Sequence, residues 1–460
     1  VSWQIFANKE VGDGGGVDGW VGDFGDNPLW LFQAYHDSLN SSNPADQQLA
    51  ARANVIKQWL PNSGLGMNAG HVLADFIAAT KAGNLPRVSW IVAPYRWCEH
   101  PAARPVDGAV YAQAVLKALW DNPKLWENTV LFVNYDENDG FYDHIVPPTP
   151  APGTADEFVN GLPIGLGPRV PMMAVSPWSR GGWVNSQVFD HTSVIRFLER
   201  WTGVKETNIS AWRRAVCGDL TSCFDFSRQN LSIPVLPDAL KLQSIADQTQ
   251  SKLPTPTPPP VGAQVMPRQE PGIRPARPIP YQPTANAVVN TATGAVTLHL
   301  ANAGEAALSL GVYPNGAAPS QHLLHPEGQA STSVPAVSDG TYDIAVYGPN
   351  GFLREFAGRR GGSAVEVTVT VAGHGDEPKL RVAVHNGGTS TATVHVTGTR
   401  PGAGRTATFR VLAGNTVTTD RDVVRDGQGW YDVLATVDGD TAFRRRFAGH
   451  VEYQADTITG

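Results

Sequence analysis

The segment from Thr129 to Pro148 limits the possible folds of this chain more than any other. Residues 129–135 are mostly β-branched or aromatic, a pattern typical of a buried strand. The strand pattern stops at Asp-Glu-Asn-Asp-Gly, positions 136–140. These polar side chains cannot continue a buried strand, because burying unpaired charge is costly. We therefore expect them at the carboxyl end of the strand, where open α/β sheets hold their ligands.

Carboxylates and a histidine gather at this expected strand end. Asp136 and Glu137 come first, and His144 follows directly after Asp143. Carboxylate oxygens suit a hard divalent cation, and a carboxylate near a histidine suits general acid–base chemistry. His144 either contacts phosphate or holds its loop by bonding a neighbouring aspartate. The alternative for the whole segment is a solvated turn with no chemistry.

A second polar group, Asp190-His191-Thr192, lies at the start of a helix predicted from Thr192. Asp190 or Thr192 could cap the backbone N–H groups of this helix, and capping is the expected role of Asp190. The same helix end could instead attract an anion. His191 has no assigned role at this point.

Composition narrows the classes of function. The chain has 460 residues, enough for roughly two to four domains. A charged fraction of 17% and a hydrophobic fraction of 42% predict a globular protein. The net charge of −7 argues against a nucleic-acid partner. No apolar run reaches the roughly 18 residues of a membrane span, so lipid contact is expected to be peripheral. Cys217 and Cys223 either form a disulfide or remain free.

The periodicity of apolar residues and the proline content divide the chain into three regions. Residues 1–235 alternate between helical and strand periodicity, which predicts an α/β domain with a mainly parallel sheet and helices on both faces. Residues 236–280 are rich in proline, including the run 254–260, and read as a semi-rigid linker. A long loop lying across the surface of the domain is the alternative.

The last part of the chain has strand periodicity and repeats itself. From residue 281, apolar and polar residues alternate with period two, and valine and threonine are abundant. Residues 342–358 are echoed by residues 431–449, with a turn signal at the same place in each copy. Two tandem β-sandwich modules, at 281–362 and 363–460, are therefore predicted.

These motifs together resemble one family. The chain is similar to the bacterial phosphocholine-preferring phospholipases C, within the broader phosphoesterase family that includes acid phosphatases. The likeness rests on stretches in the family's order, namely residues 90–94, 99–101, 134–144, 165–171, 176–179, 190–199 and 208–214, and on the repeated C-terminal modules. It implies an alkaline-phosphatase-like fold for the first region.

The resemblance also implies a site and a reaction. It assigns Asp136 and Glu137 to a divalent metal, Ca²⁺ or a similar hard cation, and places Glu137, His100 and His144 among the catalytic residues. His100 follows a predicted strand at 87–93 and so can reach the same sheet edge, although a surface-loop histidine is the alternative. The implied reaction cleaves phosphatidylcholine, or sphingomyelin, and releases phosphocholine; phosphatidylcholine yields diacylglycerol as the other product.

Other functions stay open on the sequence alone. The family's catalytic domain is expected to begin before Val1, and its hydroxyl nucleophile and an early metal-binding Glu-Asn pair are expected in that earlier segment. A phosphomonoesterase of the same family is one alternative. A truncated remnant whose modules only bind a surface is another. The family implies a secreted or periplasmic protein that meets choline-containing lipid at a membrane surface.

Overall fold

The fold comes from a computed structural model, which describes residues 1–7, 26–53, 68–101, 103–138, 145–266, 268, 272, 274–373, 378–399, 406–453 and 455–459. The chain divides into two compact units. The first consists of Val1–Phe132, Ala174–Trp178 and Phe226–Arg268. The second consists of Val133–Met173, Ser179–Asp225 and Gln269–Gly460.

The first unit contains helices and a short parallel sheet. Strands β1 (Trp3–Phe6) and β2 (Val88–Ile91) pair in parallel, with Trp3 opposite Val88. Strand β2 lies within the strand predicted at 87–93. The helices are α1 (Gln33–Asn40), α2 (Gln48–Ala53), α3 (Ala69–Val72), α4 (Ala74–Ala82), α5 (Pro105–Trp120), α6 (Pro123–Trp126) and α9 (Ala239–Thr249).

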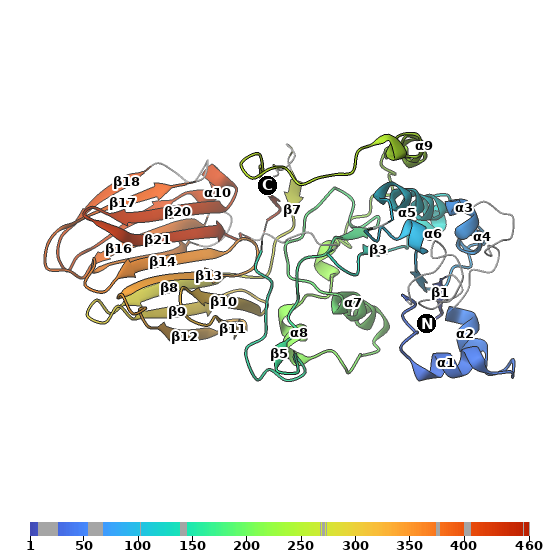
Figure 1. Cartoon of the computed structure of the whole chain (residues 1–460), viewed down its shortest axis with the longest axis horizontal. Coiled ribbons are helices and arrows are strands. Elements are labelled where there is room, and N and C mark those ends of the chain that lie inside the picture. Colours follow the sequence, from blue (N-terminus) through green and yellow to red (C-terminus); the bar gives the residue numbers. More distant parts are fainter. Residues whose placement is uncertain are drawn as a thin grey trace. The chain divides into compact units, whose positions relative to one another are not determined.

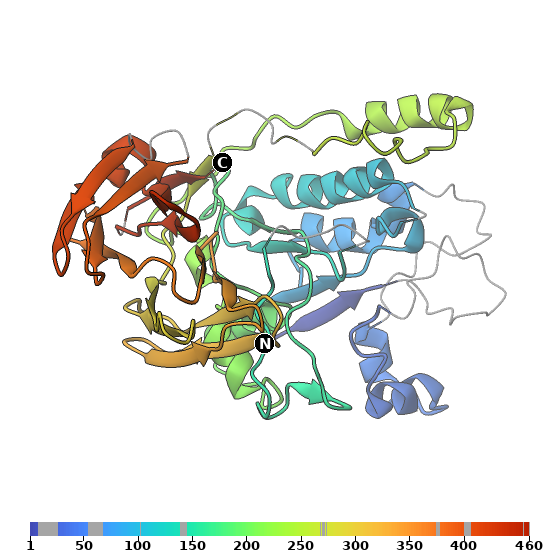
Figure 2. The same cartoon turned by 60° about the vertical axis from the view of Figure 1, so that its left-hand side comes forward.

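Helix α5 organises the core of this unit. Pro105 occupies its first turn, where a missing N–H has no consequence. Its buried face includes Val110, Val115 and Leu119, which join a core that also holds Phe76 of α4. Helix α9 packs beside α5 (Figure 2, α9 yellow-green and α5 cyan). The segment predicted as a linker therefore contains a helix, while residues 254–260 form neither helix nor strand.

Strand β3 (Leu131–Asn134) lies where the sequence predicts a strand. The second unit begins within it, at Val133. The residues of β3 that precede Asn134 are half-buried rather than fully buried. Tyr135 N donates to Pro171 O (3.3 Å), so the end of β3 meets the start of β6 (Met172–Val175). The other elements before the C-terminal strands are β4 (Phe158–Val159), β5 (Leu162–Pro163), α7 (Thr192–Thr202), α8 (Ala211–Val216) and β7 (Arg274–Ala276).

The C-terminal part of the second unit is a β-sandwich (Figure 1). One layer is an eight-stranded sheet in the order β11-β10-β13-β14-β21-β20-β17-β18. The other consists of two three-stranded sheets, β12-β9-β8 and β15-β16-β19. The elements are β8 (Pro283–Val289), β9 (Val296–Asn302), β10 (Leu308–Pro314), β11 (Ser320–Leu324), β12 (Gln329–Val334), β13 (Thr341–Tyr347), β14 (Leu353–Arg359), β15 (Val365–Ala372), β16 (Lys379–Asn386), β17 (Ala392–Gly398), β18 (Ala407–Val411), β19 (Thr416–Arg421), α10 (Val423–Gly427), β20 (Trp430–Val437), β21 (Asp440–His450) and β22 (Thr457–Thr459).

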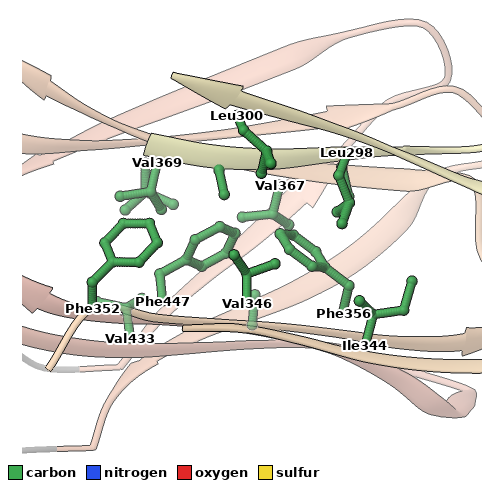
Figure 3. Close-up of a cluster of buried hydrophobic side chains, with 14 of the residues drawn as sticks. Leu298, Leu300, Ile344, Val346, Phe352, Phe356, Val367, Val369, Val433 and Phe447 are labelled. Atoms are coloured by element: carbon green, nitrogen blue, oxygen red, sulfur yellow. The ribbon is translucent and has the colours of Figure 1, made fainter. Parts of the chain in front are cut away.

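The sequence repeat is visible as symmetry in the eight-stranded sheet. Strands β10, β11, β13 and β14 of the first repeat mirror β17, β18, β20 and β21 of the second, and the two halves meet where β14 pairs antiparallel with β21. Side chains of both repeats form one core, in which Leu298 and Val367 face Phe356 and Phe447 across the layers (Figure 3). The predicted modules thus share a sheet and a core.

Each repeat contains one buried asparagine, and the two asparagines make equivalent hydrogen bonds. Asn302 and Asn386 each accept from the N–H of a glycine two residues on, at 3.0 Å, and donate to main-chain carbonyls of neighbouring segments. This explains the matching Asn-x-Gly sequences of the two repeats.

Cys217 and Cys223 are free thiols. Within the described residues, no helix is both long enough and apolar enough to cross a membrane.

Candidate active site

Strand β3 ends where the sequence turns polar. Its last residue, Asn134, and the following Asp136 and Glu137 are exposed. The chain leaves the sheet after Tyr135, so both carboxylates stay in water, as their charge requires. Their expected location at the strand's end is therefore observed. Their chemical roles remain predictions.

His191 contacts this strand end from the start of α7. Its Nδ1 lies 3.2 Å from Nδ2 of Asn134, and its Nε2 lies 3.1 Å from the main-chain O of Asp136. An amide nitrogen only donates and a carbonyl oxygen only accepts, so Nδ1 accepts and Nε2–H donates. The contacts thus select one tautomer of the neutral ring. Sequence reasoning missed this role, because 55 positions separate His191 from Asp136; the polar group at the helix start was its only signal.

The first turn of α7 is held by side chains around Asp190. Asp190 N donates to Ser193 Oγ (3.1 Å), and Thr192 Oγ1 donates to Asp190 Oδ1 (2.6 Å). The prediction that Asp190 caps the helix is wrong, since α7 has no side-chain cap. The reason is that its carboxylate is already engaged by Thr192 and by Arg213, whose Nη1 lies 2.8 Å from Oδ2.

Arg213 joins Asp190 to a second carboxylate that is fully buried. Glu157 is 0% exposed, and its Oε1 lies 2.9 Å from Nε of Arg213 and accepts from Ser210 Oγ at 2.5 Å. Ser210 in turn caps α8 by accepting from Arg213 N (3.0 Å). Burial acts to lower the pKa of Arg213, but the carboxylates of Asp190 and Glu157 outweigh it and raise that pKa above its ordinary value. This ion triad, Glu157–Arg213–Asp190, ties the start of α7 to the start of α8.

His100 belongs to the first unit, just after the turn Tyr95–Trp97. It is exposed, and its ring centroid lies 5.5 Å from that of Tyr95. The preceding Glu99 has a left-handed backbone, with φ of 67°. Gly108 of α5 gives its side chain room, because a Cβ at that position would lie 2.2 Å from Glu99. The glycine in α5 thus allows the turn that presents His100.

The predicted site residues fall into three groups. Asp136 and Glu137 lie together at the end of β3 in the second unit, whereas His100 lies in the first. His144 lies outside the described residues. Adjacent carboxylates are suitable ligands for a hard cation. Over the part of the chain that is described, no group of three or more His, Cys, Asp or Glu side chains could hold a metal ion. The role of Asp136 and Glu137 as metal ligands therefore stays a prediction.

Known families match both regions of the chain. Residues 1–205 match the phosphoesterase family, and residues 275–359 and 364–450 match the C-terminal domain of bacterial phospholipase C. The second match occurs twice, once in each of the repeats that form the sandwich.

Individual relatives are similar over most of the chain. It is 36% identical to a non-hemolytic phospholipase C of Burkholderia pseudomallei and 42% identical to one of Pseudomonas aeruginosa, over 98% of this chain in both cases. These matches span 67% and 65% of the two relatives' own length. A hemolytic phospholipase C of Pseudomonas aeruginosa is 40% identical over 80% of this chain and 56% of its own. The chain belongs to the phosphoesterase family and carries the C-terminal domain of the bacterial phospholipases C.

Proposed function

We propose that this chain is part of a phospholipase C that hydrolyses phosphatidylcholine to diacylglycerol and phosphocholine. The observation that carries the proposal is the identity of 36–42% with phospholipases C over 98% of the chain. The exposed carboxylates at the end of β3 support it, because they lie in the motif that resembles the family's active site. Sphingomyelin is a second proposed substrate, since it carries the same head group.

The proposed chemistry is the hydrolysis of one P–O bond. The bond from phosphorus to the glycerol oxygen breaks, the phosphorus gains a hydroxyl group from water, and the departing alkoxide gains a proton. A divalent cation, when bound, would neutralise charge that develops on the phosphoryl oxygens. Asp136 and Glu137 are the proposed ligands. Glu137 is also proposed to orient a histidine or accept a proton, and His100 to protonate the departing alkoxide.

The proposal also covers the location of the enzyme and its domain architecture. We place the enzyme outside the cytoplasm, in the periplasm or secreted, where it meets choline-containing lipid at a membrane surface without spanning it. Residues 1–235 are proposed to belong to an α/β domain like that of alkaline phosphatases, with residues 236–280 as a linker and modules at 281–362 and 363–460. The location and the alkaline-phosphatase-like fold rest on family resemblance, whereas the linker and the modules rest on proline content and on the internal repeat.

Replacing one proposed metal ligand tests the site. Asp136→Asn keeps the size of the side chain and removes its charge, so we expect hydrolysis of p-nitrophenylphosphorylcholine to fall by more than about 100-fold. A chelator should have a similar effect on the wild type. Unchanged turnover in Asp136→Asn would contradict the assignment of this residue.

A matched control separates the site from general charge effects. Asp438→Asn changes another exposed carboxylate of the second unit, in a hairpin turn of the sandwich, and should leave turnover unchanged. Comparing p-nitrophenyl phosphate with the choline ester distinguishes a phosphomonoesterase, which would prefer the former. A clear preference for p-nitrophenyl phosphate would overturn the proposed substrate class.

A further inference from the structure

The side chain of His191 contacts the end of β3, and it has no part in the proposed chemistry. Two hydrogen bonds join His191 to the strand end, one to the side chain of Asn134 and one to the main chain of Asp136. The second is the more informative, because the carbonyl it fixes belongs to a proposed metal ligand. Fixing that peptide group limits the directions in which the Asp136 side chain leaves the main chain.

His191 is itself held in place on both sides. Its neighbour Asp190 accepts from Arg213 at 2.8 Å, and its neighbour Thr192 donates to Asp190 at 2.6 Å. Arg213 is anchored in turn by Glu157, which is 0% exposed. Breaking a buried ion pair leaves an uncompensated charge, so this support resists displacement. His191 thus connects an ion triad, of which Glu157 is fully buried, to an exposed strand end.

We infer that His191 is a positioning residue that fixes the main chain of Asp136, and that the triad Glu157–Arg213–Asp190 fixes His191. The inference rests on the proposed function, in which Asp136 takes part in catalysis. Side chains that orient a metal-binding group affect affinity or activity by about 10- to 100-fold although they do not touch the substrate. Catalytic groups need support of this kind because small displacements lower rates sharply.

Two substitutions separate the two hydrogen bonds of His191. A glutamine places its amide near the position of Nε2, so His191→Gln retains a donor toward the Asp136 carbonyl. An asparagine reaches only as far as Nδ1, so His191→Asn retains an acceptor for Asn134 and loses that donor. If the contact with Asp136 matters, glutamine should restore function and asparagine should not.

The test combines turnover with amide hydrogen exchange in the intact enzyme that contains this chain. We expect His191→Ala and His191→Asn to lower kcat for p-nitrophenylphosphorylcholine by about 10- to 100-fold, with a smaller change in KM. Exchange should accelerate in residues 131–138 and stay slow in α7, which shows that the helix is intact. His191→Gln should remain close to the wild type in both measurements.

The controls distinguish a failure of the inference from a failure of the proposed function. His395 also makes two hydrogen bonds, to Thr408 (3.0 Å) and Asp438 (2.9 Å), so His395→Ala should change neither measurement. If Asp136→Asn is inactive while His191→Ala matches the wild type in kcat and exchange, the inference is overturned and the proposed function stands. If His191→Gln is as impaired as His191→Ala, the role of the donor is overturned. An active Asp136→Asn, or an intact wild-type enzyme without turnover, would overturn the proposed function. In that case, unchanged exchange in His191→Ala would overturn the inference as well.

Discussion

Tyr431 supplies a hydrogen-bond acceptor to a buried cation at the joint between the two repeats of the sandwich. Arg354 of β14 is 1% exposed, and its Nη2 donates to the Tyr431 hydroxyl of β20 at 2.8 Å. Its Nη1 donates to the main-chain O of Leu353 and of Ala448, each at 2.8 Å. The ring of Phe352 lies 4.0 Å from the guanidinium carbon. Tyr431→Phe therefore removes one acceptor from a charge that water does not reach.

The expected loss follows from these contacts. A hydrogen bond to a charged group contributes about 1.5–3 kcal/mol, and a buried donor left without an acceptor loses most of that. Nε of Arg354 already lacks a hydrogen-bond partner among the described residues, so the variant leaves a second N–H unsatisfied. The change removes only an oxygen, so loss of packing contributes little. We expect the sandwich to lose about 2 kcal/mol of unfolding free energy.

Amide hydrogen exchange measures this loss locally in the whole chain. A loss of about 2 kcal/mol corresponds to roughly 30-fold faster exchange of the most protected amides in β14 and β21. Tyr342→Phe should have a similar effect, because Arg445 donates to Tyr342 at 2.8 Å in the mirrored position. Tyr313→Phe is the control. Its hydroxyl is 3.3 Å from Gln321 Nε2, and we expect a change within about 0.5 kcal/mol. Unchanged protection in both Tyr431→Phe and Tyr342→Phe would refute the reasoning.

Three further substitutions test the account at separate places. Asn386→Ala removes three hydrogen bonds to the main chain of the sandwich and should lower its unfolding free energy by about 3 kcal/mol, measured by exchange; a loss below 1 kcal/mol would contradict this. The hydrogen bond from Arg214 lowers the pKa of Glu199 from 4.5 to about 2, so this pair stabilises the fold above pH 4.5 and stops doing so as the pH falls toward 2. The stability difference between the wild type and Glu199→Gln should shrink over that range, and a constant difference would refute it. Gly108→Ala should displace Glu99 and lower turnover; unchanged turnover with a gain of about 1 kcal/mol in helix stability would show that the side chains do not clash.

Several strands are predictable from the sequence because their periodicity is strong. The strand expected at 129–135 is observed at Leu131–Asn134, and the repeat of residues 342–358 at 431–449 correctly indicates equivalent hairpins. The joint between the repeats could not be predicted. It depends on the register that places Arg354 opposite Phe447 and Phe356 opposite Arg445, and local sequence does not encode pairing between distant strands.

In the candidate site, too, the features set by local sequence were predictable and those set by distant residues were not. The end of β3 was predictable, because charge cannot continue a buried strand. The role of His191 was not, since the partners Asn134 and Asp136 come from another element far along the chain. The capping prediction for Asp190 failed because a local rule cannot foresee that Arg213, on another helix, occupies the carboxylate.

Products released from phosphatidylcholine test the central claim most directly. The account predicts that the intact enzyme of which this chain is part releases phosphocholine and diacylglycerol in equal amounts, and that its Asp136→Asn variant releases neither. Release of choline with phosphatidic acid, or no release by the intact wild-type enzyme, would contradict it.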